Sequence, residues 1–594
     1  MVSAPEPEPL NLIGTWSHLL MDAFARSGVS EVVVTPGSRS TPFVLAALSN
    51  AALQCVSLID ERVAAFHALG MAKAHGRPVV LLCTSGTAPA HYLPAVIEAS
   101  LAHAPLIVLS ADRPEALQDC GAPQTIDQVK LFGDHVRWYA DLGDPQMSLG
   151  ALRALRRKAV QAVARSLHPV PGAVHVNARA AKPLEPGAAS PEQRPSAVQA
   201  LRLLDEPLTR AHLPQSVAAP QTLAQLASLL AGCTRGMIVA GPAPLSQRHE
   251  RDQVMAFARH TGFALLAEAT SQLRFVGNRE GVLALDAFDT VLRASSAAEQ
   301  LRPDVVVQLG PAPTSGAFER WISRQDAARI VIAAHGWQDP SSSAVHLVTA
   351  PIGTTLGSLV AELPRMRPDP AWRQQVTHWD AAAWRWAERL SGEDDEPSEA
   401  ACVRAVLQEV PARGLLGVGN SLPVRMVDTW CPGGGADFAV FSQRGANGID
   451  GMVAGFAGAV RASACPGVLL LGDVTLTHDL AGLSAARQTR EPLVIVAMNN
   501  NGGRIFEQLP IAALPGIERD LAYWTTPPAV DFEKAAGAFG VSYRGVAGAR
   551  ELRHALREGL GQHGCTLIEA VVPPSGAIER NRRLWAAVEQ EGSA

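Results

Sequence analysis

The stretch that most constrains this chain runs from residue 468 to residue 506, where two apolar runs flank a helical pattern. The first run reads VLLL and stops at Gly472-Asp473, and the second, 493–498, stops at a turn rich in Asn and Gly. Apolar runs of this length that end at turn residues are typical of buried strands, and the Leu and Ala residues between them recur at helical spacing. The stretch therefore predicts a β-α-β unit with two parallel strands.

Both strands of such a unit end at the same edge of the sheet, which is where open α/β sheets bind ligands. Asp473 ends the first strand, and Asn500 follows it by 27 positions, in the turn after the second strand. A carboxylate, an Asn oxygen and a glycine carbonyl are hard ligands that suit Mg²⁺, with diphosphate oxygens completing its coordination. A helix that begins after Asp473 would add backbone N–H groups to the diphosphate. The alternative is an ordinary α/β loop, because Gly-Asp and Asn-Asn pairs are common separately.

The combination of Gly-Asp and an Asn-rich turn at this spacing resembles the thiamine-diphosphate motif of the decarboxylase and synthase superfamily. The version NNNGGRIF is similar to a narrower family, the 2-succinyl-5-enolpyruvyl-6-hydroxy-3-cyclohexene-1-carboxylate synthases of menaquinone biosynthesis. The resemblance implies thiamine diphosphate as cofactor and Mg²⁺ as metal, with Mn²⁺ as an alternative. It implies that the metal ligands are Asp473, Asn500 and the Gly502 carbonyl. The remaining cofactor contacts that it implies in this stretch are Val474, Thr475, Ile505 and Phe506.

Composition bounds the class of protein. The chain has 594 residues, of which 47% are hydrophobic, so several domains with large cores are expected. A net charge of −5 argues against general nucleic-acid affinity, and the eight Cys are scattered without a CxxC, which fits a reducing cytoplasm. The N-terminus lacks the pattern of a secretory signal, and no apolar run approaches the ~20 residues of a membrane helix. We expect a cytoplasmic protein without a membrane span.

Strands that alternate with helices predict three α/β domains, each a mainly parallel, doubly wound sheet. The expected boundaries are 1–185, 210–370 and 395–594, with a Pro- and Ala-rich linker at about 183–220 and an acidic run at 393–396. By the resemblance, the first and third domains have the thiamine-diphosphate-binding fold. The strands expected in the first two domains are 31–35, 54–59, 79–83, 106–110, 172–177, 236–240, 263–267, 305–309 and 330–334.

Glu61 is the clearest single candidate outside the metal motif. It lies in LIDERVAAFHALGMAKA, at the predicted start of a helix. This segment resembles the one whose Glu hydrogen-bonds the pyrimidine N1′ of the cofactor and promotes deprotonation of the thiazolium C2. The alternative is a Glu stabilised only by the helix dipole.

Four arginines lie in turns beside glycines or after predicted strands. Arginine matches a carboxylate with a bidentate fork, although each position alone would also suit a solvated or interdomain Arg. Their segments resemble pieces of the same family, whose substrates are dicarboxylates. The substrate-binding residues that the resemblance implies are Ser38, Arg39, Arg113, Gln124, Ser421, Arg425 and Arg444. In the GANGID turn, Ile449 is expected to support the bent cofactor from below.

The resemblance fades in the middle of the chain, which we expect to be mainly structural. Family members commonly have a basic residue after Pro-x-Ser, whereas here Pro313-Thr314-Ser315 is followed by Gly316-Ala317. Arg320 is the candidate that would compensate. The histidines at 67, 75, 91, 103 and 478 match no metal or triad spacing, and we interpret them as structural.

The expected activity is that of a transferase that joins 2-oxoglutarate, with decarboxylation, to isochorismate. The resemblance also implies a homodimer or homotetramer, because these enzymes bind each cofactor between two subunits. One alternative is another thiamine-diphosphate enzyme, either acetolactate-synthase-like or a simple 2-oxo acid decarboxylase. A second is a catalytically silent homologue that serves as a binding subunit.

Overall fold

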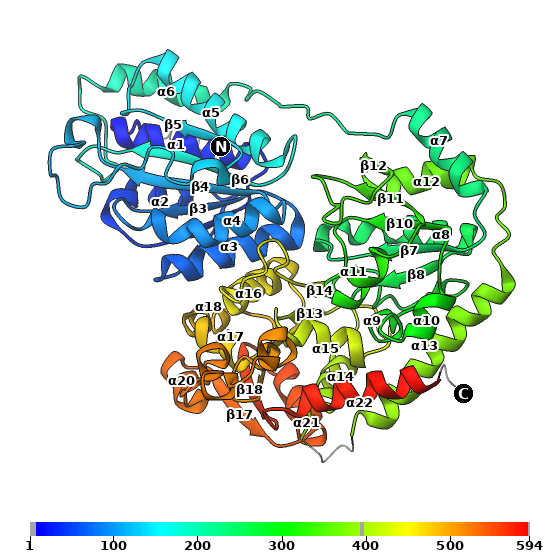
Figure 1. Ribbon diagram of the computed structural model, residues 1–594. Coiled ribbons are helices and arrows are strands. Elements are labelled where there is room, and N and C mark those ends of the chain that lie inside the picture. The colour runs from blue at the N-terminus through cyan, green and yellow to red at the C-terminus, as the bar shows by residue number, and fades with distance from the viewer. Residues whose placement is uncertain (1–7, 393–396, 592–594) are drawn as a thin grey trace. The chain divides into compact units, whose positions relative to one another are not determined.

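The computed structural model describes residues 8–392 and 397–591, so the acidic run at 393–396 and the first seven residues lie outside the described part. Three six-stranded sheets are present, and every strand pair within them is parallel. The chain divides into two compact units (Figure 1). Among the described residues, one unit holds 8–214 with 445–447 and 457–462, and the other holds the rest. The prediction of three parallel, doubly wound α/β sheets is confirmed.

The first sheet has the strand order β2-β1-β3-β4-β6-β5. Figure 1 shows α5 and α6 on one side of it and α3 and α4 on the other. The strands are β1 (Glu31–Val34), β2 (Gln54–Ser57), β3 (Val79–Cys83), β4 (Leu106–Asp112), β5 (Tyr139–Asp141) and β6 (Ala173–Arg179). The helices are α1 (Leu12–Arg26), α2 (Thr41–Leu48), α3 (Glu61–His75), α4 (Leu93–Leu101), α5 (Leu149–Leu167) and α6 (Arg194–Asp205). The short edge strand β5 was not predicted.

The second sheet has the order β12-β11-β10-β7-β8-β9. Its central strands are fully buried and, apart from Gln308 in β10, apolar, as expected for parallel strands covered on both faces. The strands are β7 (Gly236–Ala240), β8 (Ala264–Ala267), β9 (Leu283–Ala284), β10 (Val305–Leu309), β11 (Ala328–Ala333) and β12 (His346–Thr349). The helices are α7 (Pro220–Ala231), α8 (Arg251–Thr261), α9 (Phe288–Val291), α10 (Ser295–Gln300), α11 (Gly316–Ile322), α12 (Ile352–Glu362) and α13 (Pro370–Leu390).

The third sheet has the order β14-β13-β15-β16-β18-β17, and one hydrophobic core joins it to the second sheet. The strands are β13 (Leu415–Val418), β14 (Ala439–Phe441), β15 (Gly467–Gly472), β16 (Leu493–Asn499), β17 (Ser542–Val546) and β18 (Cys565–Val571). The helices are α14 (Glu399–Glu409), α15 (Leu422–Trp430), α16 (Met452–Ser463), α17 (Asp473–His478), α18 (Leu483–Ala486), α19 (Ala522–Thr525), α20 (Phe532–Phe539), α21 (Ala549–Leu560) and α22 (Gly576–Glu591). Strands β15 and β16 pair in parallel, which confirms the predicted β-α-β unit.

Two local predictions were wrong. The predicted linker contains α6, which buries Ala197, Ala200 and Leu203 on the side of the first domain. These apolar residues recur every three positions, and the Pro-rich surroundings obscured this period in the sequence. The helix expected after Asp473 is divided, because α17 ends at His478 and α18 begins only at Leu483. At the break, the Asp479 carboxylate accepts backbone N–H groups of Val453 and Ala454 at 2.7 and 3.0 Å. Asp479 therefore caps the first turn of α16.

Candidate active site

Asp473 lies where the first strand of the β-α-β unit ends, and its side chain is held by two backbone N–H groups. Oδ1 accepts from Val474 N at 2.8 Å, and Oδ2 accepts from Gly502 N at 2.7 Å. The residue is 2% exposed, and burial raises the pKa of its carboxyl group. A buried carboxylate of this kind is stabilised by a cation, so the position suits a metal ligand.

Asn500 follows β16 and is oriented by a carboxylate that the sequence did not reveal. Its Nδ2 donates to Oε1 of Glu399, the first residue of α14, at 3.2 Å. Because the amide nitrogen is directed at Glu399, the side-chain oxygen is turned the other way. Glu399 is 2% exposed, and burial raises the pKa of its carboxyl group. Nothing in local sequence links residues a hundred positions apart, which is why this pair was missed.

The turn after Asn500 requires glycine. Gly502 has φ +122°, and a Cβ there would lie 2.5 Å from the Thr525 carbonyl oxygen. Its own carbonyl accepts from Arg504 N at 2.8 Å. The Arg504 Nε donates to the Asn500 carbonyl at 3.1 Å and so closes the turn.

The predicted metal ligands are thus brought together at one edge of the third sheet. One carboxylate, one amide oxygen and one peptide carbonyl form an oxygen donor set that fits Mg²⁺ and leaves positions for diphosphate oxygens. The described part of the chain contains no cluster of three or more His, Cys, Asp and Glu side chains that could hold a metal.

The other predicted cofactor contacts lie around this edge. Val474 and Thr475 are in the first turn of α17, and Thr475 is buried. Ile505 and Phe506 are half-buried in the 3₁₀ turn Arg504–Gln508, and Ile505 packs against the hydrophobic core. Ile449 is half-buried just before α16.

Asn420 joins several segments of the third domain through one side chain. Its Nδ2 donates to the carbonyls of Gln443 and Gly448 at 2.8 and 2.7 Å, and its Oδ1 accepts from Arg444 Nη1 at 2.9 Å. The two carbonyl acceptors define which end of the amide carries the oxygen. Asn420 therefore fixes one side of the Arg444 guanidinium.

The next residue, Ser421, has φ 73° and ψ −126°, an unusual conformation for a residue with a side chain. It precedes α15, and its carbonyl accepts from Arg425 Nη1 at 2.7 Å. Burial lowers the pKa of the Arg425 guanidinium. The carboxylates of Asp289 and Glu268 act in the opposite direction and raise that pKa. The structure thus brings Ser421, Arg425 and Arg444 together at one end of the third sheet.

A second set of predicted residues lies in the first unit, at the carboxyl edge of its own sheet. Glu61 is the first residue of α3, where Asp60 caps the helix by accepting from Arg62 N at 2.9 Å. Glu61 is half-buried. Its placement after β2 and at a helix start agrees with the sequence prediction.

Ser38 and Arg39 occupy a short 3₁₀ turn after β1, with Ser38 exposed and Arg39 3% exposed. The Arg39 Nη1 donates to the Ala180 carbonyl at 2.6 Å. Gln124 has φ 56°, and its Nε2 donates to the Ser85 carbonyl at 3.1 Å.

Arg113 follows β4, and its Nη2 donates to the Pro123 carbonyl at 2.9 Å. The loop that carries Gln124 is thereby attached to two strand ends of the first sheet. Among the five histidines interpreted as structural, His75 contacts Glu31 at 2.5 Å and His67 is buried in α3. For these two residues, the contact and the burial agree with that interpretation.

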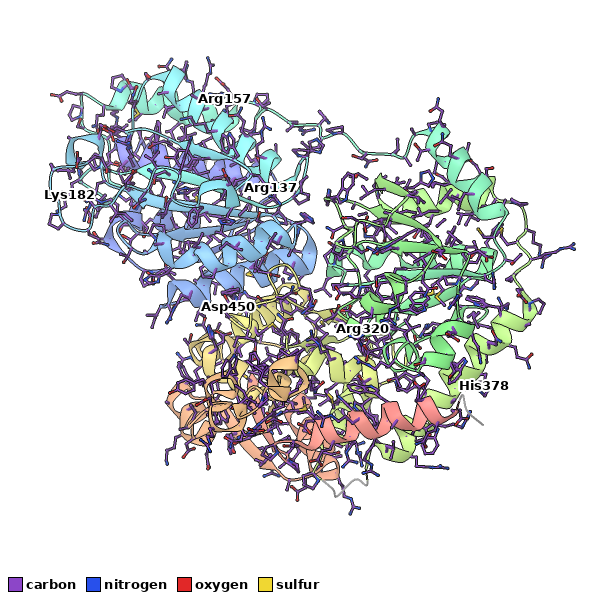
Figure 2. All side chains as sticks on the ribbon, in the orientation of Figure 1. Arg137, Arg157, Lys182, Arg320, His378 and Asp450 are labelled. Carbon is purple, nitrogen blue, oxygen red and sulfur yellow. The ribbon has the colours of Figure 1, made fainter. Side chains whose placement is uncertain are left out.

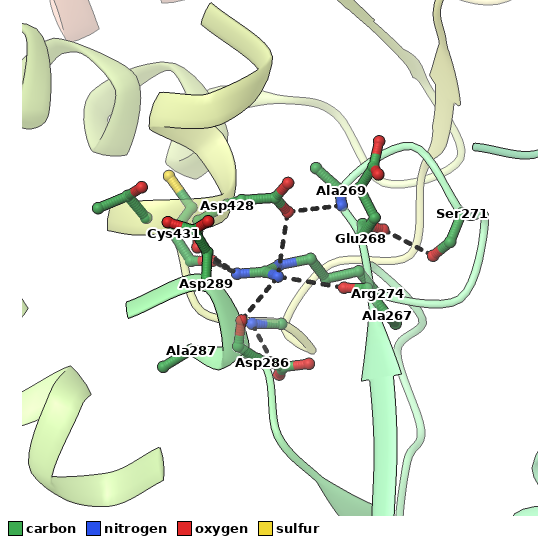
Figure 3. Close-up of polar contacts among 12 residues, drawn as sticks. Ala267, Glu268, Ala269, Ser271, Arg274, Asp286, Ala287, Asp289, Asp428 and Cys431 are labelled. Atoms are coloured by element: carbon green, nitrogen blue, oxygen red, sulfur yellow. Dashed lines mark hydrogen bonds and ion pairs between the residues drawn. The ribbon is translucent and has the colours of Figure 1, made fainter. Parts of the chain in front are cut away.

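The central domain, which the sequence indicated to be mainly structural, contributes a charged side chain that contacts the third domain. Arg274 is fully buried and donates to the backbone oxygens of Asp428 and Cys431 at 3.1 and 2.6 Å (Figure 3). It also contacts Asp428 Oδ1 at 3.3 Å, and that oxygen accepts from Ala269 N. Burial raises the pKa of the Asp428 carboxyl group. Arg274 thereby fixes the C-terminal half of α15, the helix that carries Arg425.

Arg320, the proposed substitute for a missing basic residue, is exposed on α11 (Figure 2). A Cβ built on Gly316 would lie 3.5 Å from the Arg320 Nη1. The Arg320 guanidinium therefore lies close to Gly316, the position where members of the expected family have a basic side chain.

Three domain families of thiamine pyrophosphate enzymes match successive parts of the chain. The N-terminal TPP binding domain matches residues 14–131, the middle domain 205–418 and the C-terminal TPP binding domain 440–570. The solved structure of benzoylformate decarboxylase from Polynucleobacter necessarius is 14% identical with a TM-score of 0.68, and the alignment covers 94% of this chain and 98% of that one. Fold and site together define a thiamine-pyrophosphate-dependent enzyme.

Full-length relatives narrow this class. The 2-succinyl-5-enolpyruvyl-6-hydroxy-3-cyclohexene-1-carboxylate synthase of Sorangium cellulosum is 45% identical over 600 residues, which cover 98% of this chain and 97% of the relative. The synthase of the same name from Myxococcus xanthus is 38% identical, with 97% of each chain covered. The chain belongs to this family of synthases. No helix in the described residues is long and apolar enough to cross a membrane.

Proposed function

We propose that this enzyme joins 2-oxoglutarate, with loss of CO2, to isochorismate, and so forms 2-succinyl-5-enolpyruvyl-6-hydroxy-3-cyclohexene-1-carboxylate for menaquinone biosynthesis. The substrate assignment is carried by the presence of two fixed arginines, Arg425 and Arg444, at one end of the third sheet. Each is fixed through one of two adjacent residues, Ser421 and Asn420. Two fixed guanidinium groups suit substrates that carry several carboxylates.

The proposed cofactor is thiamine diphosphate with Mg²⁺. Asp473, Asn500 and the Gly502 carbonyl would hold the metal, and the metal would hold the diphosphate. When bound, the cofactor supplies a nucleophilic carbon and an electron sink for decarboxylation. The other residues that would contact the bound cofactor are Val474, Thr475, Ile505, Phe506 and Ile449.

Glu61 would hold and release a proton at the pyrimidine N1′, as a general acid and base. Its position at the first turn of α3 gives it a fixed backbone. Arg425 and Arg444 would orient the substrate carboxylates and balance their charge, and the half-buried Ile505 and Phe506 would keep water from the reacting carbon.

The remaining substrate contacts would come from Ser38, Arg39, Arg113 and Gln124 of the first domain. By analogy with the family, each cofactor would lie between the first domain of one subunit and the third domain of its partner. The active enzyme would then be at least a homodimer. Arg320 would take the place of the missing basic residue at Gly316. The scattered, CxxC-free cysteines support placement in the cytoplasm.

The test is consumption of isochorismate, with and without 2-oxoglutarate, by the enzyme loaded with thiamine diphosphate and Mg²⁺. We expect loss of isochorismate only when both substrates are present. Release of CO2 from 2-oxoglutarate with isochorismate unchanged would instead indicate a simple 2-oxo acid decarboxylase. No cofactor-dependent CO2 release would indicate a catalytically silent subunit.

A further inference from the structure

We propose that Glu268 and Thr314 of the central domain are positioning residues for Arg444. Glu268 orients the Arg444 guanidinium indirectly, through the hydroxyl group of Thr314. This inference rests on the proposed function, because it takes Arg444 to bind a substrate carboxylate. It makes the central domain part of substrate recognition. The sequence had suggested a mainly structural domain instead.

Glu268 directly follows β8 and is fully buried. Its Oε2 accepts from Thr314 N at 2.6 Å, and its Oε1 accepts from Thr314 Oγ1 at 3.0 Å. A third donor, Thr270 Oγ1, contacts Oε1 at 2.7 Å. Glu268 therefore accepts hydrogen bonds from both the backbone N–H and the hydroxyl group of Thr314.

The hydroxyl group of Thr314 has one proton, and the carboxylate of Glu268 can only accept. Arg444 Nη2 approaches the same hydroxyl oxygen at 2.9 Å, and a guanidinium can only donate. The order of donors is therefore defined: Arg444 donates to Thr314, and Thr314 donates to Glu268. Charge at the end of such a chain strengthens each bond within it.

Two nitrogens of the Arg444 guanidinium donate to neutral oxygens. Its Nη2 rests on the neutral oxygen of Thr314, and its Nη1 rests on the neutral oxygen of Asn420. The carboxylate of Glu268 orients the guanidinium from one residue further away.

The loop that carries Thr314 is itself held close to the second sheet. Gly241 follows β7, and a Cβ there would lie 2.2 Å from the Pro311 carbonyl oxygen and 2.7 Å from Ala312. Any side chain at position 241 would push this loop away. The close approach keeps Thr314 within reach of Glu268.

The experiment compares two Thr→Val replacements that each remove one hydrogen bond to Glu268. Thr314→Val also removes the acceptor of Arg444, whereas Thr270→Val does not. We expect Thr314→Val to lower kcat/KM for one substrate about tenfold, Thr314→Ser to restore most of it, and Thr270→Val to stay near wild type. Glu268→Gln should fall between them, because an amide can still accept from the hydroxyl group.

Two further measurements separate a positioning role from general damage. Thr314→Val should add little loss in an Arg444→Ala background, because the hydroxyl group acts through that arginine. Crystal structures should show the Arg444 guanidinium displaced in Thr314→Val and unmoved in Thr270→Val. An unmoved guanidinium, or an equal loss in both backgrounds, overturns the inference. Failure of the wild type to consume both substrates refutes the proposed function instead, and the crystal structures still decide the position of Arg444.

Discussion

The Asp473 carboxylate accepts the backbone N–H of Gly502 at 2.7 Å, across 29 positions of sequence. This bond joins the end of β15 to the turn after β16 and brings the proposed metal ligands to one edge of the sheet. Because Gly502 has φ +122°, the turn can direct its N–H to the carboxylate without strain.

Replacing Asn500 with Ala should weaken Mg²⁺-dependent binding of thiamine diphosphate at least about tenfold, because a charge-assisted ligand contact is lost. Asp473→Ala should have a larger effect, since it removes the only carboxylate of the set. Isothermal titration calorimetry measures both. The matched control is Asn499→Ala, whose side chain is not a proposed ligand and contacts Glu569 at 2.6 Å and Asn501 N at 3.0 Å. Wild-type cofactor affinity in both site variants would refute the metal assignment.

Glu399→Ala should reduce Mg²⁺ affinity by about 10- to 100-fold although Glu399 is not a proposed ligand, because it orients Asn500. Glu399→Gln should retain most of the affinity, since its amide oxygen can still accept from Asn500 Nδ2. A Mg²⁺ titration at saturating cofactor measures the effect. Glu569→Ala is the control, since its carboxylate holds the neighbouring Asn499 and the Tyr543 hydroxyl group. Equal losses in Glu399→Ala and Glu569→Ala would contradict the orienting role.

Glu61→Gln should keep most of the cofactor affinity and lose the acceleration of proton exchange at the thiazolium C2. An amide cannot exchange a proton with N1′ as a carboxyl group does. Hydrogen–deuterium exchange at C2 of the bound cofactor, followed by NMR after rapid quenching, measures this step. Exchange as fast as in the wild type would remove Glu61 from the mechanism.

Arg425→Ala and Arg444→Ala should each lower kcat/KM about tenfold or more, while thiamine diphosphate binding changes little. A charge-assisted hydrogen bond is worth roughly 1.5–3 kcal/mol. Lys at either position should recover only part of the loss, because an ammonium group lacks the planar fork. Steady-state kinetics with each substrate varied in turn measures this. Unchanged kcat/KM for both substrates would show that the arginines are structural.

The sequence predicted the β-α-β unit well because its signals are local. Strand 493–498 agrees with β16 (Leu493–Asn499) to within one residue, since a continuous apolar run ends there at turn residues. Strand 79–83 agrees with β3 (Val79–Cys83) for the same reason. The short strands β5 and β9 were missed because two or three residues carry no period.

Parts of the site that depend on distant partners were not predictable in the same way. Glu399 contacts Asn500 across 101 positions, and Thr314 contacts Arg444 across 130. Glu399 lies in no motif, and the segment Pro313-Thr314-Ser315 was singled out only for the residue that follows it. Packing within the third domain brings Glu399 to Asn500, and packing of the third domain on the second brings Thr314 to Arg444. Helix α6 was missed for another reason, since its buried alanines are weak hydrophobic signals. Local patterns thus indicated the ligands, and the fold revealed what orients them.

The most direct test of the proposed reaction is mass spectrometry of the product formed from isochorismate and 2-oxoglutarate labelled with ¹³C at either carboxyl carbon. The enzyme is used as the full chain with thiamine diphosphate and Mg²⁺. We predict that label at C1 leaves as CO2 and that label at C5 is retained in a product that contains both substrates. A product that lacks the isochorismate skeleton, or that retains the C1 label, would contradict the account.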